Sequence, residues 1–395
     1  MNKPDSENKI FCGMSRREFL ERAGKLGLVV VGSGMVPNMF PRNGLAQTLK
    51  PKETTEFKVR WKNPLGKKFP PGTSLAYFSW EPWCRPYQMK VFTEHTGVSV
   101  STGIFKSTKE MLTKLGAGAA QSYDIFSPSQ YSPMQCVEAG WFQEVNLKNI
   151  PHYKDLHPAF QNSPYVYKDG KHYVIPFVWG TDAIIYNTEK IPVVDSLSIL
   201  YDPKYKGRLT IQDVATNAIP ALAIYLGFDN PFQLTEDQLQ KVKQEFKKIK
   251  PQIRTFWSSD SQANALLVSG EVWAIFTAHL AQLQPLLDEG MKAKWSWPKE
   301  GSYGWFEGIA ISSFTKNKEA AEIFADWCIG EEFGAMIAND INYYPCSTAC
   351  KVNMTKEEIQ SVYLDNPQIP TKTYMMQMPK NVDRYQEIWS EMKAL

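Results

Sequence analysis

The stretch HYVIPFVWGTDAIIYN, residues 172–187, reads as nearly continuous β-strand and decides the fold. Aliphatic, aromatic and β-branched residues fill it with few interruptions, a pattern typical of a strand that is buried on both faces. We expect this segment to pass from one sheet towards another, so that two packed bodies share one strand.

Strand and helix patterns alternate on both sides of this stretch, which predicts an α/β fold. Further strands are expected at 74–80, 98–105, 123–129, 207–213, 272–278 and 304–312. Helices are expected at 85–97, 109–119, 133–140, 217–227, 235–250, 260–271, 318–329, 331–340 and 384–395. About 350 residues that follow the N-terminal segment exceed one ordinary core, which favours two domains.

The N-terminal segment MSRREFLERAGKLGLVVVGSG, residues 14–34, has the features of an export signal. Arg16 and Arg17 precede a short apolar run, and the small residues of 44–46 offer a cleavage site. The run is shorter than the roughly 20 apolar residues of a membrane span. The Arg-Arg pair is similar to a twin-arginine signal. We therefore expect residues 1–46 to be a removable leader, and the protein to work in the periplasm after export by the twin-arginine machinery.

The charge balance argues against a nucleic-acid binder. The leader holds 7 of the 44 Lys and Arg and 4 of the 41 Asp and Glu, which leaves 37 of each in the remainder. A clustered basic surplus is therefore absent from the mature sequence. The locally basic stretch 58–72 belongs to a linker arm, 47–72, that we expect to be extended and solvated.

Five cysteines follow the leader, and their spacing does not match a zinc site. Cys346 and Cys350 are the easiest candidates for a local disulfide, although the sequence does not fix any pairing. Cys136 and Cys328 lie within apolar helical patterns and are expected to be buried thiols.

Motifs of catalysis are missing from the sequence. It has no phosphate-binding loop, no HExxH and no GxSxG, and its histidines lack metal-ligand spacing. We expect no enzyme activity, no cofactor and no metal. A secreted enzyme on the same fold is the alternative from another class, and Glu307 or His279 would be its candidate residues.

Aromatic and acidic residues gather where predicted strands end, which is where open α/β sheets bind ligands. The rings and carboxylates in these loops suit a cationic amine, because rings attract cations and carboxylates bind ammonium groups. The alternative is that the tryptophans only cover domain edges. The residues are Trp80, Glu81 and Trp83, Ser129 and Tyr131, Trp305 and Glu307, and Tyr343 and Tyr344.

Eight stretches in order resemble the periplasmic solute-binding proteins of spermidine/putrescine ABC transporters: YFSWEPW, YDIFSPSQY, VIPFVWGTDAIIYN, DPKYKGRLTIQD, SGEVWAIF, WPKEGSYGWFEGIAI, NKEAAEIFADW and NYYPCST. The resemblance covers about residues 73–395. It implies a two-lobe periplasmic-binding-protein fold of type II with a hinge, acting as a monomer with a membrane permease and an ATPase. Lobe 1 would be 73–181 plus about 307–345, and lobe 2 would be 182–306 plus about 346–395.

The resemblance also assigns binding residues. In the first lobe it implies Trp80, Trp83, Ser129, Tyr131, Trp305, Glu307 and Tyr344. In the second lobe the two carboxylate positions of the family are occupied by Val214 and Asn217, and its tryptophan position by Ala278. Trp257 could serve as a replacement ring, and Glu81 as a displaced carboxylate.

These departures leave the ligand open. A polyamine-like or other small cationic amine is expected. A zwitterionic or anionic ligand is the alternative, held at its second end by Asn217 together with Thr216, Ser259 and Ser261.

Overall fold

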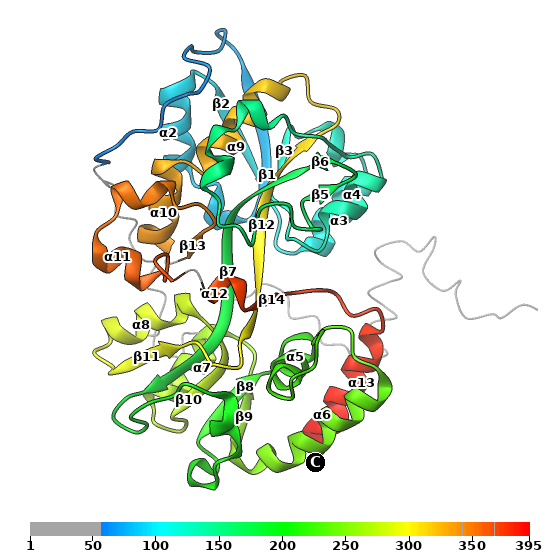
Figure 1. The fold of residues 1–395 in the computed structure, drawn as a ribbon, viewed down its shortest axis with the longest axis vertical. Helices are drawn as coiled ribbons and strands as arrows, with labels where there is room; N and C mark the ends of the chain where they lie inside the picture. Colours follow the sequence, from blue (N-terminus) through cyan, green and yellow to red (C-terminus); the bar gives the residue numbers. More distant parts are fainter. Residues whose placement is uncertain (1–56, 342, 367) are drawn as a thin grey trace, which may run out of the picture. The chain divides into compact units, whose positions relative to one another are not determined.

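Strands β7 (Val174–Asn187) and β12 (Ser302–Ser312) pair antiparallel and extend through both halves of the folded chain (Figure 1). The computed structural model describes residues 57–341, 343–366 and 368–395. β7 pairs with β12 in one half and with β10 (Ala274–His279) in the other. The prediction that 172–187 passes from one sheet to another is therefore confirmed.

A continuous path of paired strands connects the two halves in the order β2-β1-β3-β12-β7-β10-β8-β9. We call the half around β1 lobe 1 and the half around β8 lobe 2. The remaining strands of this path are β1 (Ser74–Ser79), β2 (Ser99–Ile104), β3 (Ile125–Phe126), β8 (Leu209–Gln212) and β9 (Ile253–Trp257). Short strands outside the path are β4 (Phe142–Gln143), β5 (Tyr167–Lys168), β6 (Lys171–His172), β11 (Ala293–Ser296), β13 (Tyr344–Pro345) and β14 (Thr373–Met375).

Helices cover the sheet in both lobes, as the alternating pattern predicts (Figure 1). Those of lobe 1 are α2 (Pro86–Thr96), α3 (Thr108–Gly116), α4 (Pro133–Glu138), α9 (Lys318–Cys328), α10 (Glu331–Ile341) and α11 (Lys356–Ser361). Those of lobe 2 are α5 (Ala215–Tyr225), α6 (Glu236–Ile249), α7 (Asp260–Val268), α8 (Leu283–Asp288) and α13 (Val382–Ala394). α12 (Gln368–Thr371) lies near β14.

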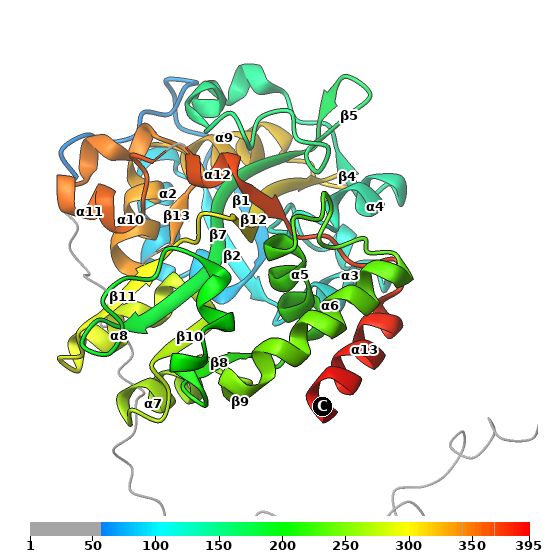
Figure 2. The same ribbon diagram turned by 60° about the horizontal axis from the view of Figure 1, so that its bottom comes forward.

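The amphipathic pattern of α6 determines which face of this helix packs in the core of lobe 2. A capping box of Thr235 and Gln238 begins the helix, and apolar residues at helical spacing, such as Val242 and Phe246, are buried. Trp389 of α13 packs edge-on against Phe246, with 5.6 Å between ring centroids. Two views show α13 beside α6 (Figures 1 and 2). The last helix of the chain therefore belongs to the core of lobe 2.

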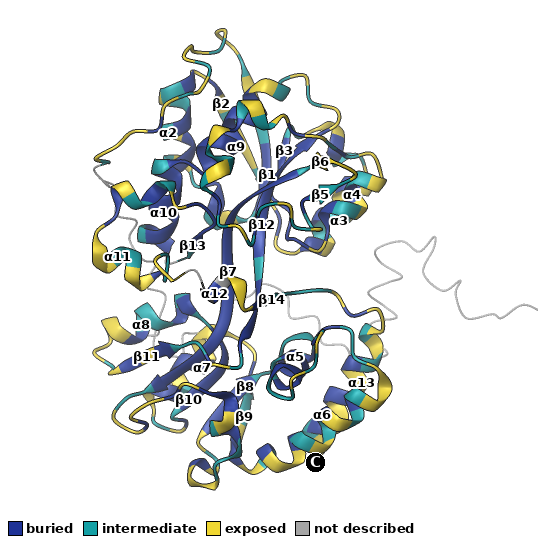
Figure 3. Ribbon diagram, viewed as in Figure 1, coloured by how far each residue is buried: buried dark blue, intermediate teal, exposed yellow. Residues whose placement is uncertain are grey.

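Burial follows the central strands. β7 is buried except at its last residue, and β12 is buried except near Trp305 (Figure 3). The outer helices present exposed faces to solvent in the same view. Trp305 is therefore the residue of β12 that the fold leaves partly accessible.

The arm that the sequence predicts to be solvated is partly docked on lobe 1. Trp61 is 1% exposed, and its Nε1 donates to Asp326 Oδ2 of α9 at 2.9 Å. Arg60 forms an ion pair with Glu332 at 2.8 Å. The expectation was wrong for these residues. It rested on the basic, Pro-rich composition of the arm and gave too little weight to Trp61, a large aromatic residue that lobe 1 buries.

Residues 346–364 also differ from the expected division into lobes. Asn353 donates to the carbonyl oxygens of Val59 and Glu331, both in lobe 1. Cys350 lies against Gly334 of α10. We propose a revised boundary, in which 346–364 belong to lobe 1 and α13 to lobe 2.

The cysteines that the structure describes are all free and buried. Cys136 and Cys328 are buried thiols, as predicted. The suggested disulfide between Cys346 and Cys350 is wrong: both thiols are free, and Cys350 Sγ donates to the carbonyl oxygen of Ser347. The leader 1–46, with its twin-arginine motif, lies outside the described residues. In the described part, none of the helices has the length and apolar character that a membrane crossing requires.

Candidate functional site

Glu307 is a buried carboxylate in the middle of β12, with 6% of the residue exposed. Its Oε2 accepts a hydrogen bond from Trp80 Nε1 at 2.9 Å, and its Oε1 accepts one from Ser129 Oγ at 2.9 Å. In the part of the chain that the structure describes, no cationic side chain forms a salt bridge with it. Three predicted site residues from distant segments therefore meet at one carboxylate.

Burial raises the pKa of Glu307 to about 8, although the hydrogen bonds from Ser129 and Trp80 lower it. A buried carboxylate without a cation is costly in its charged form, so a proton or a bound cation would stabilise it. Two donors already occupy one position on each oxygen, which leaves lone pairs for one further donor group. The site has the electrostatics of an ammonium receptor.

A chain of hydroxyl groups continues from Glu307 towards the surface. Thr108 Oγ1 lies 3.3 Å from Ser129 Oγ and 2.9 Å from the Tyr131 hydroxyl. Thr108 begins α3, and Tyr131 is 38% exposed. Tyr131 thus connects to the Glu307 carboxylate through two hydroxyl groups rather than directly.

An aromatic wall stands beside this carboxylate. Trp305 is two residues from Glu307 on β12, so both side chains lie on one face of the strand. The Trp305 ring lies 5.6 Å from that of Tyr343, which lies 5.2 Å from that of Trp83. Gly180 leaves room for the Trp305 ring, because a Cβ at residue 180 would come within 2.6 Å of the indole. Of the predicted aromatics, Trp80 contacts Glu307 and Trp305 shares its face of β12. Trp83 is buried and reaches Trp305 only through Tyr343.

Tyr344 is placed on the opposite face of the strands. β13 pairs Tyr344 with Trp179, and the two rings lie 4.8 Å apart. Trp179 in turn pairs with Phe306, whose side chain points away from that of Trp305. The structure therefore brings Tyr343 to the aromatic wall in place of Tyr344, because side chains alternate faces along a strand.

Glu81 is not brought to the buried carboxylate. It forms a surface ion pair with Arg85 at 3.2 Å, and its side chain is 58% exposed. The pair is an i,i+4 contact at the start of α2, a position that explains this glutamate without any ligand.

In lobe 2, the carboxyl ends of the parallel strands β8, β9 and β10 lie at the edge of the sheet that is nearer lobe 1, since His279 at the end of β10 pairs with Asp182 of β7. Asn217, in the first turn of α5 after β8, donates to Gln212 Oε1 at 2.7 Å. Asp213 points away to α13, where its Oδ1 accepts hydrogen bonds from Trp389 Nε1 and Lys393 Nζ at 2.7 Å each. Trp257 is 1% exposed and donates to the carbonyl oxygen of Phe276 at 3.1 Å. It is a core residue of this edge rather than an open ring.

A charged pair at this edge was missing from the predicted site. His279, the last residue of β10, lies opposite Asp182 of β7, with 2.6 Å between Nδ1 and Oδ1. Burial lowers the pKa of His279, but the charge and hydrogen bond of Asp182, with the charge of Asp260, raise it to about 9. His279 is therefore cationic at neutral pH.

Backbone geometry explains how this pair forms. The pairing of β10 with β7 shifts between Phe276 and Ala278, and Thr277 between them has φ of 58°. Positive φ is uncommon for a β-branched residue, and a bulge re-aims the side chains beyond it. The bulge could not be read from the sequence. A single carboxylate in the otherwise apolar stretch 172–187, Asp182, was the available indication, because buried charges need a partner or a function.

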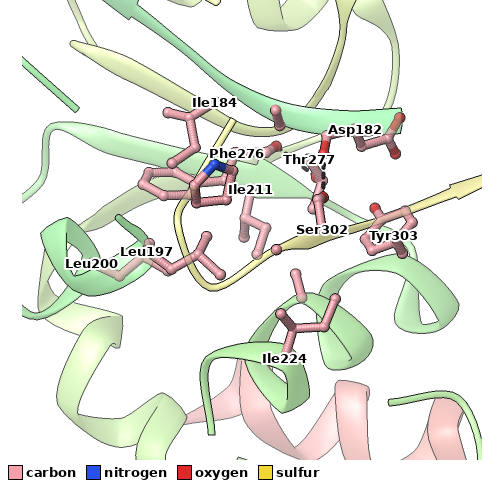
Figure 4. Close-up of a pocket in the computed structure, with 14 residues that line it drawn as sticks. Asp182, Ile184, Leu197, Leu200, Ile211, Ile224, Phe276, Thr277, Ser302 and Tyr303 are labelled. Atoms are coloured by element: carbon pink, nitrogen blue, oxygen red, sulfur yellow. Dashed lines mark hydrogen bonds between the residues drawn. The ribbon is translucent and has the colours of Figure 1, made fainter. Parts of the chain in front are cut away.

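A small cavity of about 20 Å³ lies inside lobe 2, behind this edge (Figure 4). Asp182, Thr277, Ser302 and Tyr303 lie at one end, and Leu197, Leu200 and Ile224 lie away from them. The volume suffices for about one water molecule, so this cavity alone does not hold a ligand of several heavy atoms. The described residues contain no group of three or more His, Cys, Asp or Glu arranged to hold a metal ion.

The chain is similar to known solute-binding proteins along most of its length. The sequence model of a family described as bacterial extracellular solute-binding protein matches residues 88–371. The spermidine/putrescine-binding periplasmic protein of Salmonella typhimurium is 26% identical over 333 residues, which are 81% of this chain and 92% of that protein. The putrescine-binding periplasmic protein SpuD of Pseudomonas aeruginosa is 26% identical over 308 residues, covering 73% of this chain and 82% of that protein.

A solved structure of a spermidine/putrescine ABC transporter substrate-binding protein from Streptococcus pneumoniae aligns with a TM-score of 0.71. Its sequence is 22% identical, and the alignment covers 82% of this chain and 99% of that one. At this identity the likeness concerns the fold alone, which is the α/β two-lobe periplasmic-binding-protein fold with a hinge.

Proposed function

The chain belongs to the bacterial extracellular solute-binding proteins, and we propose that it is the periplasmic receptor of an ABC importer for a small cationic amine. The ligand is of the polyamine type and binds between the lobes. The names of the relatives from Salmonella typhimurium and Pseudomonas aeruginosa support this class of ligand. The observation that carries the proposal is the buried Glu307, which has two neutral donors and no cationic partner among the described side chains.

The chemistry of recognition follows from this carboxylate and its rings. An ammonium group beside Glu307 forms a charge-assisted hydrogen bond, which is about twice as strong as a neutral one. Trp80 and Trp305 offer ring faces to the adjoining methylene groups and to the charge, a cation–π attraction of about 0.5–2 kcal/mol per ring. The carbon chain and one charged end of the amine are thereby held by lobe 1.

Binding is coupled to a hinge motion. β7 and β12 cross between the lobes, so bending at these strands brings the edge of lobe 2 towards Glu307 and Trp305. The closed form then presents a surface to a membrane permease that an ATPase drives. Export of the folded protein by the twin-arginine route, directed by Arg16 and Arg17, would place it in the periplasm.

Titration calorimetry with putrescine and spermidine tests the proposal. We expect both amines to bind the wild-type protein and Glu307→Gln to weaken binding tenfold or more, because one charged hydrogen bond is lost. Glu81→Gln is the matched control, since it removes an exposed carboxylate of the same lobe and is expected to change affinity less than twofold. Unchanged affinity in Glu307→Gln, or no amine binding by the wild-type protein, would contradict the proposal.

A further inference from the structure

A second carboxylate lies on the same face of the crossing strands as Glu307. Trp305 pairs with Gly180, and Asp182 follows Gly180 by two residues on β7. Glu307 pairs with Val178, two positions from Gly180 on the lobe 1 side. Val178 and Asp182 are four residues apart on β7, so the two carboxylates are separated by four residues along the strands. At about 3.3 Å per residue, their backbone positions are separated by about 13 Å.

Tyr343 lies close enough to both carboxylates for their charges to act on it. The Tyr343 ring lies against Trp305, and the pKa of Tyr343 is raised by burial and then by the charges of Asp260, Asp182 and Glu307. Asp260 begins α7 at the lobe 2 edge. At this edge the charges of Asp182 and Asp260 both act on His279 and raise its pKa.

Asp182 also has an unsatisfied polar neighbour. Tyr303 is 1% exposed, and its hydroxyl lies near Asp182 and Thr277 without a hydrogen bond of normal geometry to a described residue. The charge of Asp182 acts on Tyr303, and both residues line the same end of the small cavity (Figure 4). A buried hydroxyl without a partner is unfavourable until something binds to it.

We propose that Asp182, with the Tyr303 hydroxyl, is the subsite for the second ammonium group of the ligand. It takes over the role that Val214 and Asn217 cannot fill, and it rests on the proposed amine-binding function of Glu307. His279 holds Oδ1 of Asp182, and the second carboxylate oxygen, with the nearby Tyr303 hydroxyl, receives the ammonium group. Asp260 adds negative charge at the edge.

The separation of the two subsites selects ligand length. The nitrogens of putrescine are five bonds apart, and five bonds of about 1.5 Å span at most about 7.5 Å. The nine bonds between the terminal nitrogens of spermidine allow a span close to the backbone separation. Spermidine is therefore expected to reach both carboxylates, and putrescine to use Glu307 alone.

Calorimetry with spermidine, putrescine, butylamine and 5-aminovalerate tests the subsite in wild-type protein, Asp182→Asn and Glu307→Gln. We expect Asp182→Asn to weaken spermidine at least tenfold and to change putrescine and butylamine less than twofold, whereas Glu307→Gln weakens all three. Tyr303→Phe removes only the hydroxyl and is expected to weaken spermidine alone, by about threefold or more. Glu289→Gln, an exposed acid of lobe 2, is the matched control, and thermal melting confirms that each variant is folded.

The outcomes separate the two proposals. If the wild-type protein binds spermidine but Asp182→Asn and Tyr303→Phe leave that affinity within twofold, the subsite is overturned and the amine receptor stands. Tighter binding of 5-aminovalerate than of spermidine also overturns the subsite, because His279 would then be binding a carboxylate. If no amine binds the wild-type protein, both proposals fail.

Discussion

The indole Nε1 of Trp80 donates to Oε2 of Glu307 at 2.9 Å, across 227 positions of sequence. This contact joins the loop after β1 to the strand that links the lobes. It orients the carboxyl group without supplying a positive charge, so in the proposed receptor Trp80 positions the group that binds the ammonium ligand.

Replacing Trp80 by Phe keeps an aromatic ring and removes this donor. Because a hydrogen bond to a charged group contributes about 1.5–3 kcal/mol, we expect Trp80→Phe to raise the pKa of Glu307 further and to weaken spermidine binding about tenfold. Calorimetry at pH 7 measures the affinity, with Glu81→Gln as the control on the same loop. Affinity equal to that of the wild-type protein would show that the indole donor does not prepare the carboxylate.

Ligand binding is expected to release a proton. The pKa of Glu307 in the free protein is raised to about 8 from a usual value of 4.5, and an ammonium ligand favours its charged form. Amine affinity should therefore increase as pH rises from about 6 to 8, and calorimetry in buffers of different ionisation enthalpy should detect the proton. Glu307→Gln should lose both effects, and proton release that persists in this variant would assign the proton to another group.

The same shift predicts the pH dependence of stability without ligand. The folded state holds the proton of Glu307 up to about pH 8, whereas the unfolded state loses it near pH 4.5. The folded state therefore binds more protons in this window, and this contribution to stability declines as pH rises through it. Urea unfolding at pH 5 and pH 8 should show a smaller decline in Glu307→Gln than in the wild-type protein. An equal decline in both would contradict the assignment.

Gly180 tests the position of Trp305. A Cβ at residue 180 would come within 2.6 Å of the indole, so Gly180→Ala should displace the ring while leaving the strand paired. We expect amine affinity to fall threefold or more, with a change in tryptophan fluorescence. Gly116→Ala is the control, because its φ is not positive and a Cβ there would meet only Trp141 at 3.8 Å, an ordinary contact. Unchanged binding in Gly180→Ala would place Trp305 outside the site.

Trp61 tests whether the arm is part of lobe 1. Trp61→Ala removes a fully buried ring and the hydrogen bond to Asp326, and large-to-small changes of this kind cost about 3–5 kcal/mol. The free energy of unfolding, measured by urea titration, should fall by that amount. Lys62→Ala, the exposed neighbour, should change it by less than about 0.5 kcal/mol. If Trp61→Ala lowers the free energy of unfolding no more than Lys62→Ala does, the arm is solvated, as its composition predicts.

The fold could be predicted well from sequence because its patterns are local. The run 172–187 gives β7, and helical periodicity gives α6 and its buried Phe246. The site was harder because its geometry depends on strand register and bulges. Tyr343 and Tyr344 differ by one position, and only the pairing of Tyr344 with Trp179 decides which ring faces Glu307. The contact of His279 with Asp182 depends on the shift at Thr277.

The crossing strands β7 and β12 carry Glu307, Trp305 and Asp182 on the segment where the lobes turn. In the proposed receptor, a ligand bound there lies near the fulcrum of closure, where a given rotation produces the least displacement. The lobe edges, far from the fulcrum, have the longer lever arm. In this arrangement the ligand contacts at the crossing strands determine affinity. The outer surfaces of the lobes move furthest, so a small rotation changes their relative position enough for a membrane partner to distinguish the closed form.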